Sequence, residues 1–291
     1  MKFTRINPIL LFLLLITTGC GSSSVLNQGK VSPSNFYAKT KFSTNKSLIL
    51  LPCEIDGQTR VFLFDTGATV TTVQRDSMFG KIVSVRGASN RTVENGTETI
   101  KSFKIGEVDF VNTFATNEKL PELKTKIPNF GGILGRSIIN KANWLIDSPN
   151  KTIEISNRDL SDDSFMDILL DKSRDAPYTA IEINGKQYGA IVDLGSSSVF
   201  NVPEGTELAT WLLQRYNFKA ENRERYTVGG SEMITEQIGI IPLLRIGDME
   251  FKAVRVNINQ SSQIRVGMGL FKHSIIYIDN ENRRYRLKPA D

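Results

Sequence analysis

The sequence VFLFDTGATVTTV, from Val61 to Val73, places an aspartate directly after four apolar residues. Such a run is typical of a buried strand, and a carboxylate beside it costs free energy unless it is paired or used. A later stretch, GAIVDLGSSSVF, repeats the arrangement, because Asp193 also follows apolar residues and precedes Leu194-Gly195. The meaning of Asp65 and Asp193 therefore depends on whether the two come together.

Three pairs of segments recur in one order along the chain. EIDGQTRVFLFDTG (54–67) matches EINGKQYGAIVDLG (182–195), FKIGEVDF (103–110) matches LRIGDMEF (244–251), and ILGRSIINKANWLID (133–147) matches RVGMGLFKHSIIYID (265–279). In the first pair, the turn glycine precedes the aspartate by the same distance, 57 to 65 and 185 to 193. Matched blocks in the same order indicate an internal duplication.

Each half has the pattern of short strands joined by tight turns. Asp56-Gly57 and Asn184-Gly185 predict two-residue hairpin turns between apolar runs. Ile105-Gly106 and Ile246-Gly247 separate a further pair of strands in each half. Apolar residues at helical spacing predict one helix over residues 207–218. We therefore expect an all-β fold of two similar lobes.

The N-terminus has the pattern of a bacterial export signal. Lys2 and Arg5 precede an apolar run that ends at Ile16, and Cys20 follows a Thr-Thr-Gly sequence. This resembles a lipoprotein signal, in which the cysteine becomes the lipidated N-terminus; a plain cleaved signal is the alternative. We expect a protein of the bacterial cell envelope that is exported and lipid-anchored to a membrane. The expected segments are a signal peptide (1–19), a flexible tether (20–39), an N-terminal lobe (40–157), an interlobe connection (158–175) and a C-terminal lobe (176–290).

Composition and motifs exclude several classes of chemistry. The net charge of +5 comes from scattered residues, which argues against a nucleic-acid partner. The one histidine, His273, cannot form the usual zinc site, and no phosphate-binding or dinucleotide motif is present. Cys53 lies in an apolar run and is expected to be a buried, unpaired thiol. Carboxylates remain as the reactive groups, so no metal or cofactor is expected.

The D-T-G-A sequence after a hairpin, followed later by Ile133-Leu134-Gly135-Arg136, resembles the retropepsin-like aspartic proteases. The resemblance covers most of both halves, although the second half rests on Asp193, Gly195 and Val266-Gly267 without a complete D-T-G. It implies two pepsin-type β-barrel lobes in one chain, with an active site at their interface.

The resemblance also implies an aspartic-type endopeptidase that acts on peptides or unfolded protein without a cofactor. Asp65 and Asp193 would be catalytic, because two carboxylates about 3 Å apart share one proton and supply both an acid and a base. The residues expected to support the two active-site loops are Thr66, Gly67, Ala68, Gly195 and Ser196. The candidate flaps over the substrate, for which ordinary hairpin turns are the alternative, contain Gly87, Ala88, Gly229 and Gly230.

Two departures from the family pattern affect the second loop. Leu194 replaces the hydroxyl residue of the family, so Thr66 is expected to lack its bracing partner across the interface. Ser196 stands where the first loop has Ala68, and a hydroxyl bonded to Asp193 would favour this aspartate as the ionised member of the pair.

Two other functions remain open at this level. One is a non-catalytic peptide-binding lipoprotein that lost turnover through the change at Leu194. The other is a homodimer that uses two copies of Asp65, although the intact second set of blocks favours a monomer.

Overall fold

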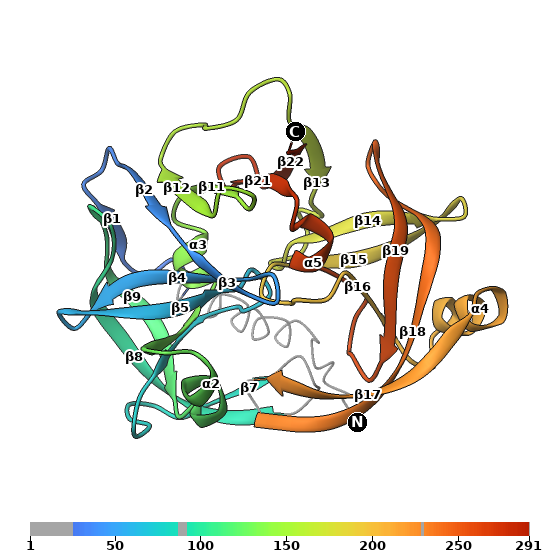
Figure 1. Ribbon diagram of the computed structural model, residues 1–291. Helices are drawn as coiled ribbons and strands as arrows, with labels where there is room; N and C mark the ends of the chain where they lie inside the picture. Colours follow the sequence, from blue (N-terminus) through green and yellow to red (C-terminus); the bar gives the residue numbers. More distant parts are fainter. Residues whose placement is uncertain (1–25, 87–91, 228–229, 291) are drawn as a thin grey trace, which may run out of the picture.

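The computed structural model describes residues 26–86, 92–227 and 230–290 of the protein. The fold is mostly β, with two ring-like mixed sheets, one on each side of the view in Figure 1, and a third sheet that joins them above. The sequence prediction of a β fold is confirmed at this level.

The first ring-like sheet is nine-stranded and has the order β1-β9-β6-β10-β5-β4-β8-β7, with β3 paired to β4. It closes on itself because β9 also pairs with β8. Its strands are β1 (Lys30–Ser32), β3 (Ser43–Asn45), β4 (Leu48–Ile55), β5 (Gln58–Phe64), β6 (Thr71–Gln74), β7 (Val83–Arg86), β8 (Thr92–Ile105), β9 (Val108–Glu118) and β10 (Phe130–Leu134).

The second ring-like sheet is seven-stranded and has the order β14-β15-β20-β16-β19-β18-β17. A pairing between β14 and β18 closes it. Its strands are β14 (Tyr178–Ile183), β15 (Lys186–Asp193), β16 (Phe200–Pro203), β17 (Phe218–Thr227), β18 (Gly230–Ile246), β19 (Met249–Asn259) and β20 (Arg265–Gly267).

The two rings share one strand order. The circuit β4-β5-β10-β6-β9-β8 of the first corresponds to β14-β15-β20-β16-β19-β18 of the second. The directions also agree, because β5 runs parallel to β10 as β15 does to β20, and β6 parallel to β9 as β16 does to β19. The matched blocks of the sequence therefore occupy matched places in the fold.

The third sheet was not predicted from the sequence. It is six-stranded, in the order β13-β22-β21-β11-β12-β2, and β11 and β21 pair antiparallel at its centre. Its strands are β2 (Tyr37–Lys41), β11 (Asn143–Asp147), β12 (Thr152–Ser156), β13 (Met166–Leu169), β21 (Ser274–Asp279) and β22 (Arg284–Pro289). Both halves of the chain contribute strands, so backbone hydrogen bonds join the halves directly.

In the described part of the chain, four short helices connect the strands: α2 (Pro121–Lys126), α3 (Arg136–Ile139), α4 (Glu207–Arg215) and α5 (Met268–Phe271). The predicted helix over residues 207–218 is α4, but it ends at Arg215 because Phe218 already begins β17. The Thr206 hydroxyl caps its start by accepting from the Ala209 backbone N–H. α3 and α5 occupy corresponding positions in the two copies of the third repeated block, residues 133–147 and 265–279.

The predicted turns and the predicted tether have different outcomes. Asp56-Gly57 and Asn184-Gly185 form the hairpin turns, with positive φ at all four residues as a type I′ turn requires. The tether prediction for residues 20–39 is wrong for its described end, because β1 pairs with β9 and β2 pairs with β12. Backbone hydrogen bonding to existing sheets orders this polar segment despite its composition.

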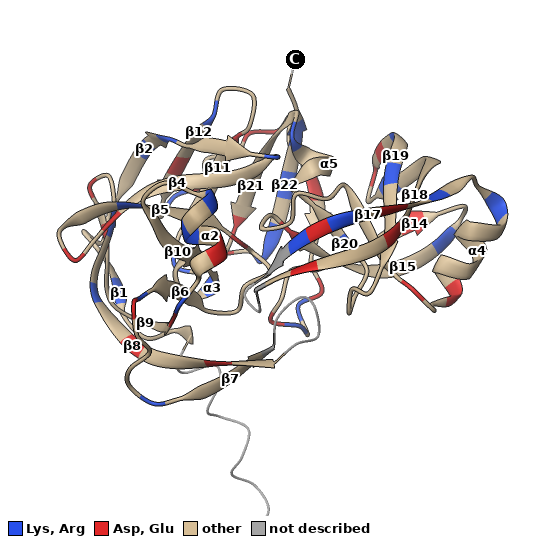
Figure 2. Cartoon of the chain, turned by 60° about the horizontal axis from the view of Figure 1, so that its bottom comes forward, with Lys and Arg blue, Asp and Glu red and all other residues tan. Residues whose placement is uncertain are grey.

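A continuous apolar core fills both rings and lies beneath the third sheet. Trp144 of β11 packs edge-on against Phe64 with ring centroids 5.2 Å apart and stacks on Phe110 at 6.2 Å. Cys53 is buried and unpaired, as predicted, and burial raises the pKa of its thiol well above the usual value. Acidic and basic residues are interspersed along β17 and scattered over the rest of the described chain (Figure 2).

Candidate active site

The structure brings Asp65 and Asp193 together. Asp65 follows β5 and Asp193 ends β15, so each ring supplies one aspartate from an equivalent strand. Their carboxyl groups lie within hydrogen-bonding reach of each other. Asp193 is buried and Asp65 is partly exposed, so the pair sits at an accessible but largely desolvated point between the rings.

Glycines after each aspartate make the approach possible. A Cβ atom added at position 195 would lie 2.1 Å from Cγ of Asp65, and one at position 67 would lie 2.8 Å from Cγ of Asp193. Real Cβ atoms do not approach other atoms this closely. Glycine is therefore required at 67 and 195 for the backbone of each loop to pass against the opposite carboxyl group.

Backbone N–H groups hold both carboxyl groups in place. The amides of Gly67 and Ala68 donate to Oδ1 of Asp65 at 2.8 and 3.1 Å. The amide of Gly195 donates to Oδ1 of Asp193 at 2.9 Å. These contacts place Gly67, Ala68 and Gly195 at the positions that the sequence assigned to loop support.

Ser196 differs from the prediction. Its backbone N–H donates to the Asp193 carbonyl at 3.2 Å, and its hydroxyl accepts from the Ser198 N–H at 3.4 Å. No hydrogen bond joins the Ser196 hydroxyl to the Asp193 carboxyl within the described residues. The hydroxyl of Ser196 points along its own loop instead of toward Asp193. The expected contact between this hydroxyl and the carboxylate is therefore not formed.

The expectation that Thr66 lacks a partner is wrong. Its hydroxyl donates to the Val192 carbonyl at 2.9 Å and accepts from the Leu194 N–H at 3.0 Å, so both bonds reach the backbone of the opposite loop. The brace needs no side-chain hydroxyl at position 194. Leu194 is fully buried in the core, which supplies packing in place of the second half of a symmetric brace.

The environment of the pair raises the pKa of Asp65 to about 8. Desolvation is the largest cause, followed by the charge of Asp193 and the hydrogen bond with it; the Gly67 N–H and Arg265 act in the opposite direction. At neutral pH the two carboxyl groups therefore hold one proton between them.

Two arginines and a tyrosine surround the pair, and the sequence did not single out any of them for this site. Nε of Arg265 lies 2.8 Å from Oδ2 of Asp193, in an ion pair whose N–H is not aligned for a hydrogen bond. Burial lowers the pKa of Arg136 in α3, while the nearby charge of Asp65 acts in the opposite direction, and Tyr285 of β22 lies against Thr66. The sequence did contain an indication for Arg265. In the third pair of matched blocks, this charged residue aligns with the apolar Ile133.

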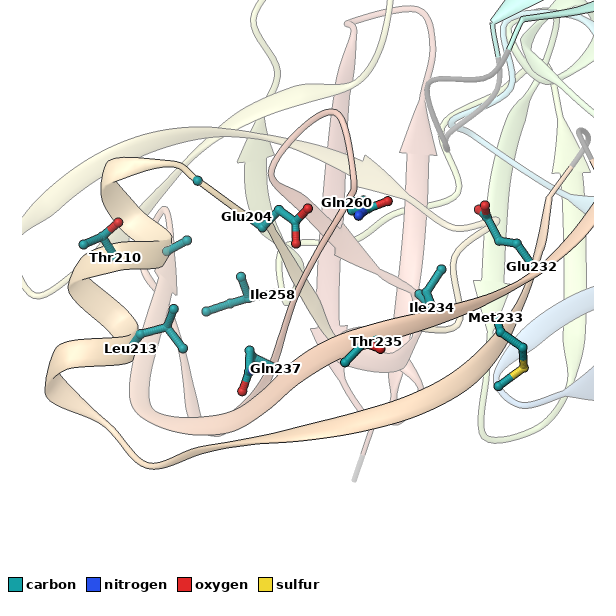
Figure 3. A pocket seen from close by; sticks show the side chains of 12 residues that line it. Glu204, Thr210, Leu213, Glu232, Met233, Ile234, Thr235, Gln237, Ile258 and Gln260 are labelled. Carbon is teal, nitrogen blue, oxygen red and sulfur yellow. The ribbon is translucent and has the colours of Figure 1, made fainter.

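Other predicted features lie apart from the pair. His273 is exposed in a turn, and the described residues contain no group of side chains that could hold a metal ion. A groove of about 540 Å³ lies between α4 and the β18–β19 hairpin, with Thr210 and Leu213 on its helical wall (Figure 3). Neither Asp65 nor Asp193 lines this groove, so it is separate from the carboxyl site.

Several predicted residues cannot be placed. Gly87, Ala88 and Gly229 of the candidate flaps, and the lipidation candidate Cys20, lie outside the described residues. Gly230 is the first residue of β18 and pairs with Thr227 of β17. The hairpins β7–β8 and β17–β18 that carry the candidate flaps both occur, one in each ring.

Comparison of the sequence with protein-family models gave no match, and comparison with curated proteins gave none either. The meaning of the site therefore rests on its own residues and their geometry.

Proposed function

We propose that the chain is an aspartic-type endopeptidase of the retropepsin-like kind. In this proposal the rings are two pepsin-type β-barrel lobes, residues 40–157 and 176–290, which arose by internal duplication. The observation that carries the proposal is the meeting of Asp65 and Asp193, each at the end of an equivalent strand of its ring. Two largely desolvated carboxyl groups in contact are costly, and shared-proton catalysis gives both a use.

The first step of the proposed reaction uses both states of the pair. Asp193, as the ionised member, takes a proton from a water molecule, whose oxygen attacks the carbonyl carbon of the peptide bond. Asp65 gives its proton to the carbonyl oxygen, so a neutral tetrahedral diol forms. The raised pKa of Asp65, about 8, keeps this proton available at neutral pH.

The second step reverses the roles. Asp193 gives the proton that it took from water to the leaving nitrogen, the carbon–nitrogen bond breaks, and Asp65 takes a proton from one diol hydroxyl. The products are a carboxylic acid and an amine, and the pair returns to its starting state. Positioning by the Gly67, Ala68 and Gly195 amides keeps both carboxyl groups in place through the cycle.

The brace of Thr66 favours this proposal over a peptide-binding protein without catalysis. A protein without catalysis was suggested by the missing hydroxyl at position 194, but Thr66 makes two hydrogen bonds across the interface without it. A protein that only binds peptides has no need to keep two mutually repelling carboxyl groups in contact. Because both aspartates come from one chain, the site also needs no second copy, which favours a monomer.

We also propose that the enzyme acts outside the cytoplasm on peptides or unfolded protein, anchored to a bacterial membrane by a lipid on Cys20. The signal-like residues and this cysteine support the anchor. In the described part of the chain, no helix has the length and apolar character to cross a bilayer. The β7–β8 and β17–β18 hairpins would carry the flaps over the substrate.

The test is hydrolysis of a mixed peptide library by the purified chain, from acidic to weakly alkaline pH, in water labelled with heavy oxygen. We expect cleavage, with the label in the new carboxyl group already in a single turnover, because water attacks directly. Binding of peptides with no cleavage at any pH would contradict the proposal and support the non-catalytic alternative.

A further inference from the structure

We propose that Arg265 is a positioning residue of the carboxyl pair: it holds Asp193 in the ionised form and so keeps the pair singly ionised in acidic solution. This inference rests on the proposed function, and it names a residue outside the two matched aspartate loops. Its basis is the contact of Arg265 Nε with Asp193 Oδ2 at 2.8 Å, between side chains that are 12% and 9% exposed.

The strand register explains how Arg265 reaches Asp193. β20 runs parallel to β15, with Arg265 beside Ile191 and Gly267 beside Asp193. The side chain of Arg265 therefore starts two residues before the aspartate and extends along the strand to it. Since Gly195 N–H occupies Oδ1 of Asp193, the guanidinium and the backbone amide bind different oxygens of the same carboxylate.

The first ring provides a built-in comparison. Ile133 of β10 holds the position that Arg265 holds in β20, because Ile133 pairs with Leu63 and Arg265 pairs with Ile191, each two residues before the aspartate. Ile133 packs in an apolar cluster with Leu63 and Phe130. Among the described residues, Asp65 therefore receives backbone N–H bonds without a cation in contact, whereas Asp193 receives both, and on this asymmetry we assign the negative charge of the pair to Asp193.

The other charged and titratable groups at the pair do not duplicate this contact. Arg136, from α3 on the side of Asp65, donates to the Asp175 carbonyl and to the Thr69 hydroxyl. Tyr285 of β22 has a pKa well above its usual value, chiefly because of burial, so it is neutral. Within the described residues, Arg265 is the side chain that forms an ion pair with a carboxyl group of the dyad.

The consequence for pH dependence has a definite sign. The pair loses activity in acid when it takes up a second proton, and a guanidinium beside Asp193 opposes that uptake. Removing the charge therefore moves the acid limb of the activity profile to higher pH. An opposite charge at this distance displaces a carboxyl titration by about 1 to 3 pH units. The alkaline limb follows the loss of the proton that the two carboxyl groups share, because the pKa of Asp65 is raised by burial and by the charge of Asp193.

The experiment compares profiles of kcat/KM against pH for the full chain, Arg265→Met, Arg265→Lys and the control Arg245→Met. Arg245 is an exposed arginine of β18 that pairs with Glu182 and Glu250, so its loss removes one charge far from the proposed chemistry. We expect Arg265→Met to move the acid limb upward by about 1 to 3 pH units. In Arg265→Lys the acid limb should stay close to its wild-type pH, and the profile of Arg245→Met should match that of the wild type.

A second measurement separates this inference from the proposed function. Titration of carbon-13-labelled aspartate side chains by NMR reports proton uptake by the pair without any turnover. An upward displacement in Arg265→Met supports the role of Arg265 even if the wild-type chain cleaves no peptide. An unchanged titration and an unchanged acid limb in a folded Arg265→Met variant, or an equal displacement in Arg245→Met, would overturn the inference.

Discussion

Replacing Thr66 by Val tests the brace between the two active-site loops. Val keeps the size and branching of Thr but exchanges the hydroxyl for a methyl group. The change removes the bonds to the Val192 carbonyl at 2.9 Å and from the Leu194 N–H at 3.0 Å. Because Thr66 is fully buried, water cannot replace either partner.

The expected loss can be worked out from these two bonds. A buried backbone group left without a partner costs about 1 to 3 kcal/mol, so two such groups lower the free energy of unfolding by about 2 to 4 kcal/mol after partial relaxation. For a chain of this size, that corresponds to a melting temperature lower by about 3 to 7 °C. The loops also lose their link at the carboxyl pair, so peptide cleavage should slow by about tenfold or more.

The assay is urea and thermal unfolding of wild type, Thr66→Val and Thr66→Ser, together with cleavage of one peptide substrate. Thr66→Ser keeps the hydroxyl and loses only a methyl group, for about 1 kcal/mol. We expect the Ser variant to remain close to wild type in both stability and cleavage. A Val variant as stable as wild type, or a Ser variant as damaged as the Val variant, would refute the brace.

Three further changes have defined outcomes. Leu194→Thr should lower the melting temperature, because it removes fully buried apolar atoms and adds a hydroxyl that Thr66, already hydrogen-bonded, does not need. A higher melting temperature together with faster cleavage would show that a brace was missing. Gly195→Ala should reduce cleavage about 100-fold by displacing Asp65. The control Gly189→Ala, where a Cβ meets nothing within 4 Å, should leave cleavage unchanged, and equal rates in the two variants would contradict the close approach of Gly195 to Asp65. Cys20→Ser should release the protein from membranes in cell fractionation, and persistent association would indicate another anchor.

The sequence was sufficient for features that depend on local patterns. The Asp-Gly and Asn-Gly turns, the strands around them and the correspondence of the repeated blocks all occur as predicted. The meeting of Asp65 and Asp193 followed from the repeat, because equivalent loops of two like rings can face each other at one point.

Features that depend on long-range packing were not accessible from the sequence. The third sheet arises from pairing between β11 and β21, which lie far apart in the chain and carry no turn signal. The Thr66 brace uses backbone atoms of the opposite loop, so no side-chain motif at position 194 could indicate it. The Ser196 hydroxyl was expected at the carboxylate, but its conformation turns it toward the Ser198 N–H, and the side chain that contacts Asp193 is Arg265.

The most direct test of the shared carboxyl pair is the cleavage rate of Asp193→Asn, measured beside Asp65→Asn on the same peptide and at the pH optimum of the wild-type chain. Each variant keeps the size of the side chain but cannot hold or release the shared proton. With circular dichroism and melting temperature near wild type, we predict a loss of about 100- to 10,000-fold in kcat for each variant. A folded Asp193→Asn variant that retains kcat within a few-fold of wild type would contradict the account, because the second aspartate would then have no part in the chemistry.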